Sequence, residues 1–239
     1  MAIADIAIFI GQSNGMSWGT LGQPVPGGYT ADPSVLIWNL IAGGWQQYNP
    51  GVNSETWGTG TTCWGPELQW SRRWRHEYPN RALCIVKQTV GSTGVANTAS
   101  TDWSPYSFSE LFDAIVNNLN LSLSQLSGNV ISVNWIGNEQ DALTQADAEA
   151  CQQNMIEFER AIRAKLYAQD ASFVISRLTN DPFIPYGDTV RRAQEALALK
   201  PGNFIVNTDD MPLSNGHYVP SDVLKLGDRM FDAHWNYTL

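Results

Sequence analysis

The chain has little positive charge, few cysteines and few histidines. Only 14 lysines and arginines stand against 23 acidic residues, the net charge is −9, and no basic block occurs, so we expect no nucleic-acid partner. Its three cysteines, Cys63, Cys84 and Cys151, lie far apart and form no CxxC pair, and the three histidines do not cluster at ligand spacing. The sequence therefore predicts no zinc site.

A long hydrophobic run is also missing. The longest apolar run, residues 6–10, is far too short to span a bilayer, so we expect no membrane insertion. No basic stretch precedes it and no small-residue cleavage site follows it, so we predict no signal peptide. The compartment stays open: the sequence fits a cytoplasmic protein, and it equally fits a mature or excised domain of a secreted or surface protein.

What the chain does have is a regular hydrophobic pattern, and its 239 residues suit one α/β domain, residues 1–239, with a sizeable core. Five short runs rich in β-branched residues predict buried strands: 3–10, 82–87, 130–136, 172–178 and 203–206. Helical spacing recurs between and after them: 66–75, 108–126, 151–166, 189–199 and 220–231. This alternation predicts a parallel sheet of five strands with right-handed crossovers.

One irregular stretch, at about residues 18–64, interrupts this pattern. It is rich in glycine and tryptophan, and within it only residues 35–38 and 45–48 look extended. Several of the chain's ten tryptophans lie in loop-like sequence: Trp18, Trp45, Trp57, Trp64 and Trp103. They fit ordinary packing, and they also fit a rim on which sugars stack. A long insert of this kind is usually functional or shapes the substrate site.

Small and polar residues follow four of the five predicted strands. The segments are 11–15, 91–94, 137–141, 209–210 and 215–217. In open α/β sheets, ligand sites form outside the carboxyl ends of the strands, so these segments are expected at one edge of the sheet. They supply a hydroxyl, amide donors, carboxylates and an imidazole, which is the set that nucleophilic catalysis needs.

Ser13 and His217 are the candidate nucleophile and base. Glycines on either side of Ser13 allow a sharp turn that exposes its hydroxyl, although a serine after a strand also fits a simple helix cap. The G-x-S-x-G pattern matches the elbow of α/β-hydrolases, but here it follows the first strand, which argues against that fold. His217 lies in a loop beside Gly216, whereas His76 and His234 fit surface or packing positions.

Gly91 and Asn138 are candidate donors to an oxyanion. Gly91 would use its backbone N–H and Asn138 its side-chain amide, and each such donor is worth about 2.7–4 kcal/mol in the transition state. Each residue also fits an ordinary turn.

The segment Gly11-Gln12-Ser13-Asn14 resembles the GQSN nucleophile block of the sialate O-acetylesterase-like SGNH hydrolases, also called carbohydrate esterase family 6. Other segments resemble this family's motifs in the family's order: Val35-Leu36-Ile37-Trp38, Gly44-Trp45, Pro50, Gly65-Pro66-Glu67, Lys87, Gly91-Ser92-Thr93, Trp103, residues 135–141, His217-Tyr218 and residues 226–229. The match runs from Ile3 to about Arg229. Any one motif is weak, but the ordered set is specific.

The resemblance implies a flavodoxin-like three-layer α/β/α sandwich and hydrolysis of an acetyl ester on an O-acetylated sugar or polysaccharide, with no metal or organic cofactor. It places the nucleophile at Ser13 and the base at His217. It also implies an oxyanion hole made by Ser13, Gly91 and a side-chain amide after the third strand, which we assign to Asn138. Gln12, Asn14 and Glu139 are expected to support the site or the substrate.

Two positions depart from the family pattern. Ser214 stands where the family has an aspartate three residues before the histidine, so the acid of a triad is in question. Asp209, Asp210, Glu139 or a backbone carbonyl could orient His217 instead, and of these we select Asp210. Gly137-Asn138 replaces Gln-Gly, which moves the amide by one position.

Two other functions stay open. The missing aspartate and the tryptophan-rich insert also fit a carbohydrate-binding module that has little activity and keeps the scaffold of an esterase. A lipase or thioesterase of the same fold is the other alternative, against which the sequence shows no long apolar lid.

Overall fold

A seven-stranded sheet forms the centre of the computed structural model, which describes residues 3–54, 63–98 and 101–238. The strands are β1 (Ala4–Gly11), β2 (Val35–Asn39), β3 (Gly44–Gln47), β4 (Leu83–Thr89), β5 (Gly128–Ile136), β6 (Ser172–Ser176) and β7 (Asn203–Val206). Their order across the sheet is β3-β2-β4-β1-β5-β6-β7, and only β3 runs antiparallel to its neighbour.

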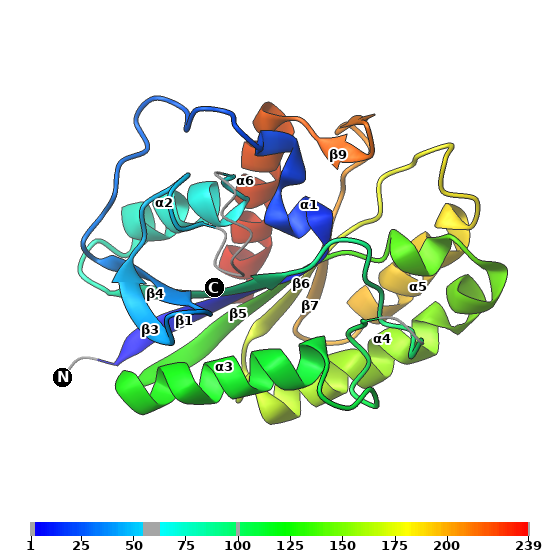
Figure 1. The fold of residues 1–239 in the computed structure, drawn as a ribbon, viewed down its shortest axis with the longest axis horizontal. Coiled ribbons are helices and arrows are strands. Elements are labelled where there is room, and N and C mark those ends of the chain that lie inside the picture. Colours follow the sequence, from blue (N-terminus) through cyan, green and yellow to red (C-terminus); the bar gives the residue numbers. More distant parts are fainter. Residues whose placement is uncertain (1–2, 55–62, 99–100, 239) are drawn as a thin grey trace.

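Helices cover both faces of this sheet and complete three layers (Figure 1). They are α1 (Ser13–Met16), α2 (Glu67–Glu77), α3 (Leu111–Gln125), α4 (Gln145–Lys165), α5 (Gly187–Ala198) and α6 (Pro220–Thr238). The α2 and α6 helices pack together on one face, while α3, α4 and α5 lie on the other. None of the helices in the described ranges is long and apolar enough to cross a membrane.

The five predicted strands are confirmed as β1, β4, β5, β6 and β7, and their order β4-β1-β5-β6-β7 is the flavodoxin-like order. The predicted number of strands is wrong, because the insert adds β2 and β3 at one edge. Gly43 turns the chain between them at φ +61°, and the side chain of Asn39 accepts hydrogen bonds from the N–H groups of Ile41 and Ala42. A hairpin in the insert therefore widens the sheet.

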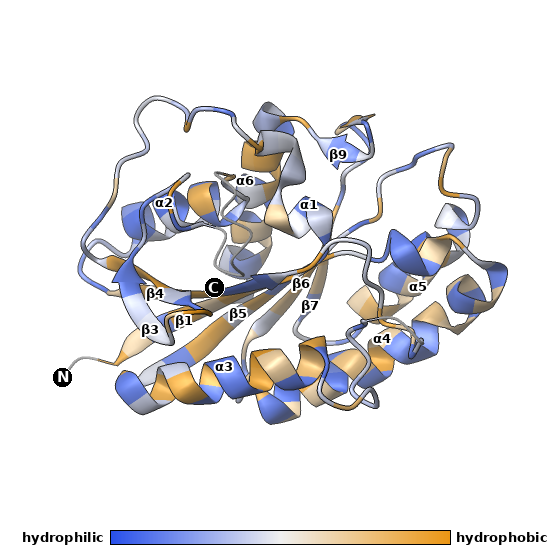
Figure 2. Cartoon of the chain, viewed as in Figure 1, coloured by the Kyte–Doolittle hydropathy of each residue, from blue (hydrophilic) through white to orange (hydrophobic). Residues whose placement is uncertain are grey.

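Alternate side chains of β1 enter different halves of the core. Ile6 and Ile8 pack with the side chains of α3, α4 and α5, whereas Ala7 and Phe9 pack with those of α2 and α6. All eight residues of β1 are buried, which explains why this strand reads as a continuous hydrophobic run. Figure 2 shows hydrophobic residues along much of the central strands, and both hydrophobic and hydrophilic residues on the helices.

Most loop tryptophans serve packing. Trp64 and Trp103 are fully buried, and the indole N–H of Trp45 donates to the carbonyl of Ser122 on α3 at 3.1 Å. Trp18 differs, because 41% of its surface is exposed. Trp57 lies outside the described residues.

A buried ion pair joins the first turn of α2 to the sheet. Lys87 Nζ lies 2.9 Å from Glu67 Oε2, and both side chains are almost completely buried. The other carboxylate oxygen, Glu67 Oε1, accepts hydrogen bonds from the hydroxyl of Tyr48 at 3.2 Å and from the N–H of Gly65 at 3.0 Å. Each carboxylate oxygen is thus satisfied, which a charge inside the core requires.

Candidate active site

Ser13 lies where β1 ends and α1 begins. Two glycines let this turn pack tightly against the neighbouring strands. Gly11 has a φ of +140°, and a Cβ there would lie 1.9 Å from the carbonyl oxygen of Ile136 on β5. A Cβ at Gly15 would lie 2.9 Å from Cγ2 of Thr89 on β4. A side chain at either position would clash with a neighbouring strand, which explains why glycines stand on both sides of Ser13.

Gly91 lies beside Ser13, just after β4. A Cβ at Gly91 would lie 3.7 Å from the Cβ of Ser13. The adjoining N–H of Val90 donates to the carbonyl of Gly11 at 2.9 Å. The carboxyl ends of β1 and β4 thus meet at the serine, as expected for neighbouring parallel strands.

His217 begins the second strand of a small hairpin, formed by β8 (Leu213–Ser214) and β9 (His217–Tyr218). Its two-residue turn is Asn215-Gly216, with φ values of +51° and +77°. Left-handed backbone at both positions is the geometry of a type I′ turn, for which Asn-Gly is the preferred pair. The tight turn accounts for the shortened segment before His217, and the Asn-Gly pair is the sequence signal that could have predicted the hairpin.

Asn14 connects the serine turn to this hairpin. Its Oδ1 accepts a hydrogen bond from the N–H of Tyr218 at 3.1 Å, and its Nδ2 donates to the carbonyl of Gly216 at 3.4 Å. The neighbour of Ser13 therefore holds the residues on both sides of His217. In Figure 1, α1 and β9 lie close together above the sheet, although they are far apart in the sequence.

Glu139 and Gln12 extend this network to the loop after β5. Asn14 Nδ2 donates to Glu139 Oε1 at 2.6 Å, whereas Glu139 Oε2 is buried and has no hydrogen-bond partner within the described residues. Burial raises the pKa of Glu139, and the hydrogen bond from Asn14 opposes this shift. The side-chain oxygen of Gln12 accepts from the N–H of Gln140 at 3.4 Å. Both residues thus tie the serine turn to β5.

His217 is partly buried and faces a carbonyl. Burial lowers its pKa, and a hydrogen bond with the backbone of Asn215 opposes this shift. Because that bond favours the protonated ring, the imidazole acts as donor and the Asn215 carbonyl as acceptor. In the described part of the chain, no ion pair joins His217 to a carboxylate.

Asp210, selected from the sequence as the orienting acid, has other partners. Its two oxygens accept from Arg229 at 2.6 and 2.8 Å, and Lys225 approaches to 3.3 Å. These bonds hold the pKa of Asp210 well below its usual range. Its neighbour Asp209 pairs with Arg177 and Arg191. Neither aspartate has a hydrogen bond to His217 among the described residues, so the structure gives no support to Asp210 as the acid.

The Asn138 amide is also occupied elsewhere. Its Oδ1 accepts from the indole of Trp135 at 2.7 Å and from Gln194 at 2.9 Å, while its Nδ2 donates to Asp141 at 2.8 Å and approaches the Sγ of Cys151 at 3.9 Å. The residue is fully buried, so this geometry leaves no amide hydrogen free for an oxyanion.

The backbone explains why an asparagine stands there. Asn138 has a φ of +87°, in the region that favours glycine and that asparagine tolerates better than most residues. Asn138 thus takes the place of the family's glycine, and Gly137 takes the place of its glutamine. The expectation that the amide had moved by one position therefore finds no support in this geometry.

Two cavities flank the hairpin that carries His217. One has a volume of about 350 Å³ and is lined by Trp18, Gly19, Ser214, Asn215, His217, Tyr218 and Val219. The other has about 570 Å³ and shares Asn215 with the first. Gly19, in the short helix η1 (Trp18–Thr20), fits tightly here, because a Cβ would lie 2.0 Å from the carbonyl oxygen of Tyr218. The start of the insert therefore forms a wall of the candidate site.

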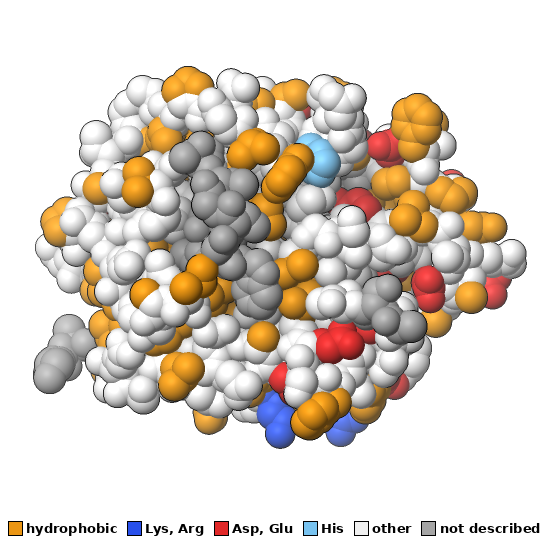
Figure 3. Space-filling view, in the orientation of Figure 1, with side chains coloured by type: hydrophobic (Ala, Val, Ile, Leu, Met, Phe, Trp, Pro, Cys, Tyr) orange, Lys and Arg blue, Asp and Glu red, His pale blue; other side chains and the backbone are white. Residues whose placement is uncertain are grey.

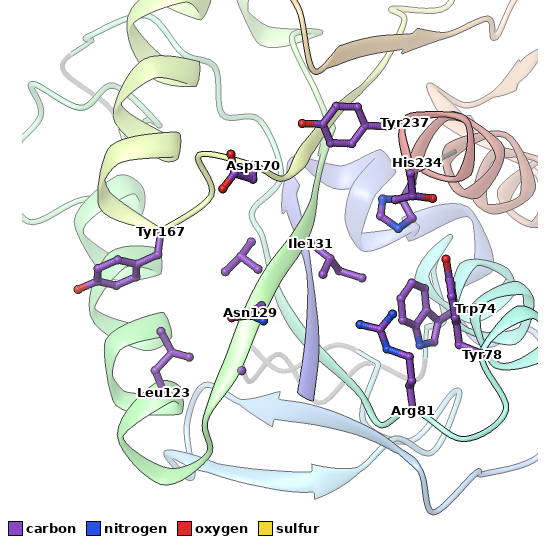
Figure 4. A pocket seen from close by; sticks show the side chains of 13 residues that line it. Trp74, Tyr78, Arg81, Leu123, Asn129, Ile131, Tyr167, Asp170, His234 and Tyr237 are labelled. Carbon is purple, nitrogen blue, oxygen red and sulfur yellow. The ribbon is translucent and has the colours of Figure 1, made fainter. Parts of the chain in front are cut away.

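A larger cavity, of about 620 Å³, lies at the opposite, amino edge of the sheet (Figure 4). The first residues of β5 line it together with Trp74, Tyr78 and His234. His234 is buried, and its Nδ1 lies 2.9 Å from the hydroxyl of Ser172. Because Ser13 is at the carboxyl edge, this cavity does not belong to the candidate active site.

Three solved structures resemble the chain. A protein from Arabidopsis thaliana has a TM-score of 0.83 at 20% identity and covers 98% of this chain and 99% of its own. NanS has a TM-score of 0.73 at 14% identity, with coverage of 99% and 98%. A carbohydrate acetylesterase from Xanthomonas citri has a TM-score of 0.68 at 17% identity; the match covers 96% of this chain but 55% of that protein. At such low sequence identities, the structural similarity shows that the chain shares the fold of these three proteins.

A comparison with curated proteins gave no match. The family model described as "Carbohydrate esterase, sialic acid-specific acetylesterase" matches residues 3–236, almost the whole chain. Members of this family are carboxylic ester hydrolases that act on acetylated sugars, as the motif order from Ser13 to His217 implied. The chain belongs to the sialic acid-specific acetylesterase family of carbohydrate esterases.

Proposed function

We propose that the protein removes acetyl groups from O-acetylated carbohydrate through an acyl-enzyme on Ser13, with His217 as general base. The observation that carries this proposal is the contact of Asn14 with both neighbours of His217, which fixes the hairpin beside the serine turn. These hydrogen bonds hold the proposed nucleophile and base on two linked turns, and nucleophilic catalysis needs a base within hydrogen-bond reach of the nucleophile.

The reaction has two steps. Because burial lowers its pKa, His217 is neutral at neutral pH and accepts the proton of Ser13 Oγ as that oxygen attacks the acetyl carbon. The tetrahedral intermediate collapses, the bond to the sugar oxygen breaks, and His217 returns the proton to the sugar. Water then gives a proton to His217 and attacks the acetyl-serine, which releases acetate and restores the hydroxyl.

Two backbone groups would stabilise the oxyanion. These are the N–H groups of Ser13 and Gly91, which belong to adjoining turns. The Asn138 amide is left out, because its hydrogens are engaged in the core. One donor of this kind contributes about 2.7–4 kcal/mol, so an oxyanion hole with two donors in place of three predicts a slower enzyme.

The base would be oriented by a carbonyl. We assign this role to Asn215, whose backbone bonds to the imidazole, and withdraw it from Asp210. A neutral carbonyl fixes the tautomer of His217 but stabilises the imidazolium less than a carboxylate does. In serine proteases, loss of the aspartate's charge lowers kcat by about 10⁴. We therefore assign a Ser–His dyad with modest turnover.

The whole chain is proposed to act as one domain. Residues 1–239 would form a single catalytic unit, in which the insert at about 18–64 contributes Trp18 and Gly19 to the wall beside His217.

Within residues 3–54, 63–98 and 101–238, no carboxylate forms an ion pair with His217, and this favours a second function. In it, the chain binds acetylated glycans and turns them over little or not at all. This alternative predicts that Ser13→Ala binds the same glycans as the wild type and that neither protein releases acetate.

Hydrolysis of 4-nitrophenyl acetate tests the proposal. We expect turnover by the wild type and a loss of about 10⁴-fold or more in Ser13→Ala and His217→Ala. The matched control is Asp210→Asn, which removes an exposed ion pair and should stay within about twofold of the wild type. Full activity in Ser13→Ala would refute the proposal, and a large loss in Asp210→Asn would return Asp210 to the acid's role.

A further inference from the structure

The second cavity beside the hairpin has an amphipathic lining. Its walls come from the loops that follow β6 and β7 and from the turn before His217, and they comprise Asn180, Asp181, Pro182, Phe183, Pro212, Leu213, Asn215 and Gly216. Through Asn215 it adjoins the cavity that contains His217 itself. The walls of this cavity therefore lie within reach of a ligand that is bound beside His217.

Phe183 presents its ring to solvent from a fixed loop. The side chain is 87% exposed. The backbone beneath it is held, because the N–H of Phe183 donates to Asp181 Oδ1 at 2.9 Å and the N–H of Ile184 donates to the carbonyl of Asp181 at 3.0 Å. The N–H of Tyr186 donates to the carbonyl of Ala142 at 3.1 Å, which ties the loop to the short helix η2 (Gln140–Ala142) after β5. An aromatic ring on a rigid support loses little entropy when a ligand stacks on it.

The mixture of groups fits a sugar better than an acyl chain. The flat C–H face of a pyranose suits an aromatic ring, and its hydroxyl groups need polar partners. Phe183 and Pro182 supply apolar surface, while Asn180, Asp181 and Asn215 supply donors and acceptors. An acyl chain would leave these polar groups without partners, which disfavours a lipid in this place.

The charged residues that line these cavities indicate which class of sugar can bind there. No lysine or arginine lines either of the two cavities beside His217, or a third cavity of about 330 Å³ that includes Ser92 and Asp147 beyond Ser13. Residues 55–62 and 99–100, outside the described part, include no lysine or arginine in the sequence. Figure 3 agrees, since Lys and Arg side chains appear on this face only near its lower edge, far from β9 in Figure 1. A carboxylate on a sugar would therefore meet acidic side chains at these cavities and no lysine or arginine with which to pair.

We propose that the cavity lined by Phe183 binds a neutral glycosyl unit next to the acetylated sugar, so that the substrate is a neutral oligosaccharide or polysaccharide and not a sialic acid. This inference rests on the proposed function, because it places the ester at Ser13. Phe183 stacks on the sugar ring, and Asn180, Asp181 and Asn215 contact its hydroxyl groups.

Binding tests this inference without turnover. In the Ser13→Ala background, calorimetry compares partly O-acetylated cellopentaose with O-acetylated N-acetylneuraminic acid. We expect the neutral ligand to bind more tightly, and Phe183→Ala to weaken it about tenfold, the loss of one stacked ring. Phe108→Ala is the matched control, since Phe108 is 90% exposed but lines neither cavity. Asn180→Arg, which adds a cation, should strengthen binding of the sialic acid.

The inference is overturned if the sialic acid binds more tightly to the chain, or if Phe183→Ala and Phe108→Ala have the same effect. Hydrolysis of 4-nitrophenyl acetate by the wild type separates the two proposals. If the wild type does not hydrolyse this ester, the proposed function fails, and the binding result still decides whether the cavity holds a sugar.

Discussion

The side chain of Asn14 accepts a hydrogen bond from the N–H of Tyr218 at 3.1 Å, across 204 positions of the sequence. This contact joins the first turn of the chain to its last hairpin. It also places the residue after Ser13 against the residue after His217. The alignment of the proposed nucleophile and base therefore depends on one buried amide and on what holds it.

Glu139 is the residue that holds this amide, so its loss should slow turnover. In Glu139→Leu, Asn14 Nδ2 loses its 2.6 Å acceptor, and we expect kcat to fall about 100-fold, with little change in KM, as the hairpin shifts. Glu139→Gln keeps an oxygen that can accept the same hydrogen bond and should recover most of kcat. Steady-state kinetics on an acetate ester measure both. An equal loss in the two variants, or a change confined to KM, would contradict a positioning role.

The pH dependence of kcat/KM reports on His217. Since burial lowers its pKa below the usual value of 6.5, the midpoint of the activity loss on the acid side should lie below pH 6.5. Ser214 pairs with His217 across the hairpin, so both side chains lie on one face. A carboxylate in Ser214→Asp should raise the pKa of His217 and move the acidic limb to higher pH. Ser214→Asn is the neutral control. If the acidic limb of the kcat/KM profile does not move in Ser214→Asp, the side chains at positions 214 and 217 do not interact.

The ion pair between Lys87 and Glu67 should control stability rather than chemistry. Lys87→Met leaves a buried carboxylate without its cation, which should lower the free energy of unfolding by about 3–5 kcal/mol. The double variant Lys87→Met/Glu67→Leu removes both charges and should lose less than the sum of the two single variants. Urea unfolding measures all three proteins. A loss below about 1 kcal/mol in Lys87→Met, the range of exposed pairs, would contradict the buried geometry.

His234 should make stability depend on pH below neutrality. Burial lowers its pKa to about 4, from 6.5, so the unfolded chain binds this proton at a higher pH than the folded chain does. The stability present above pH 6.5 is therefore lost as the pH falls toward 4, by about 3 kcal/mol for this residue. The difference in unfolding free energy between wild type and His234→Phe, measured at pH 7 and pH 4, isolates the effect. A difference that does not change with pH would contradict a neutral, buried imidazole.

The sheet could be predicted because its strands are buried on both faces. Runs such as the one around Ile6 and Ile8 have no polar alternation to obscure them, and the helices between the strands fix a parallel sheet. The strands β2 and β3 were harder to predict, because they lie at an edge and β3 is partly exposed. Local composition does not tell whether an extended segment in an insert joins the sheet.

The site was predicted in part. The motif order placed Ser13, Gly91 and His217 in segments that the fold brings to one edge, since parallel strands end there. The partners of Asp210 and Asn138 could not be predicted, because Arg229 and Gln194 reach them through tertiary packing. A residue type that suits a role does not tell which group its side chain meets.

The acetylated enzyme is the most direct test of the proposed mechanism. Wild type mixed with an acetate ester and quenched in acid should carry the mass of one acetyl group on the peptide that contains Ser13, and Ser13→Ala should carry none. His217→Ala should acetylate far more slowly. Turnover by the wild type with acetate on no residue, or on a residue other than Ser13, would contradict the assignment of Ser13 as nucleophile.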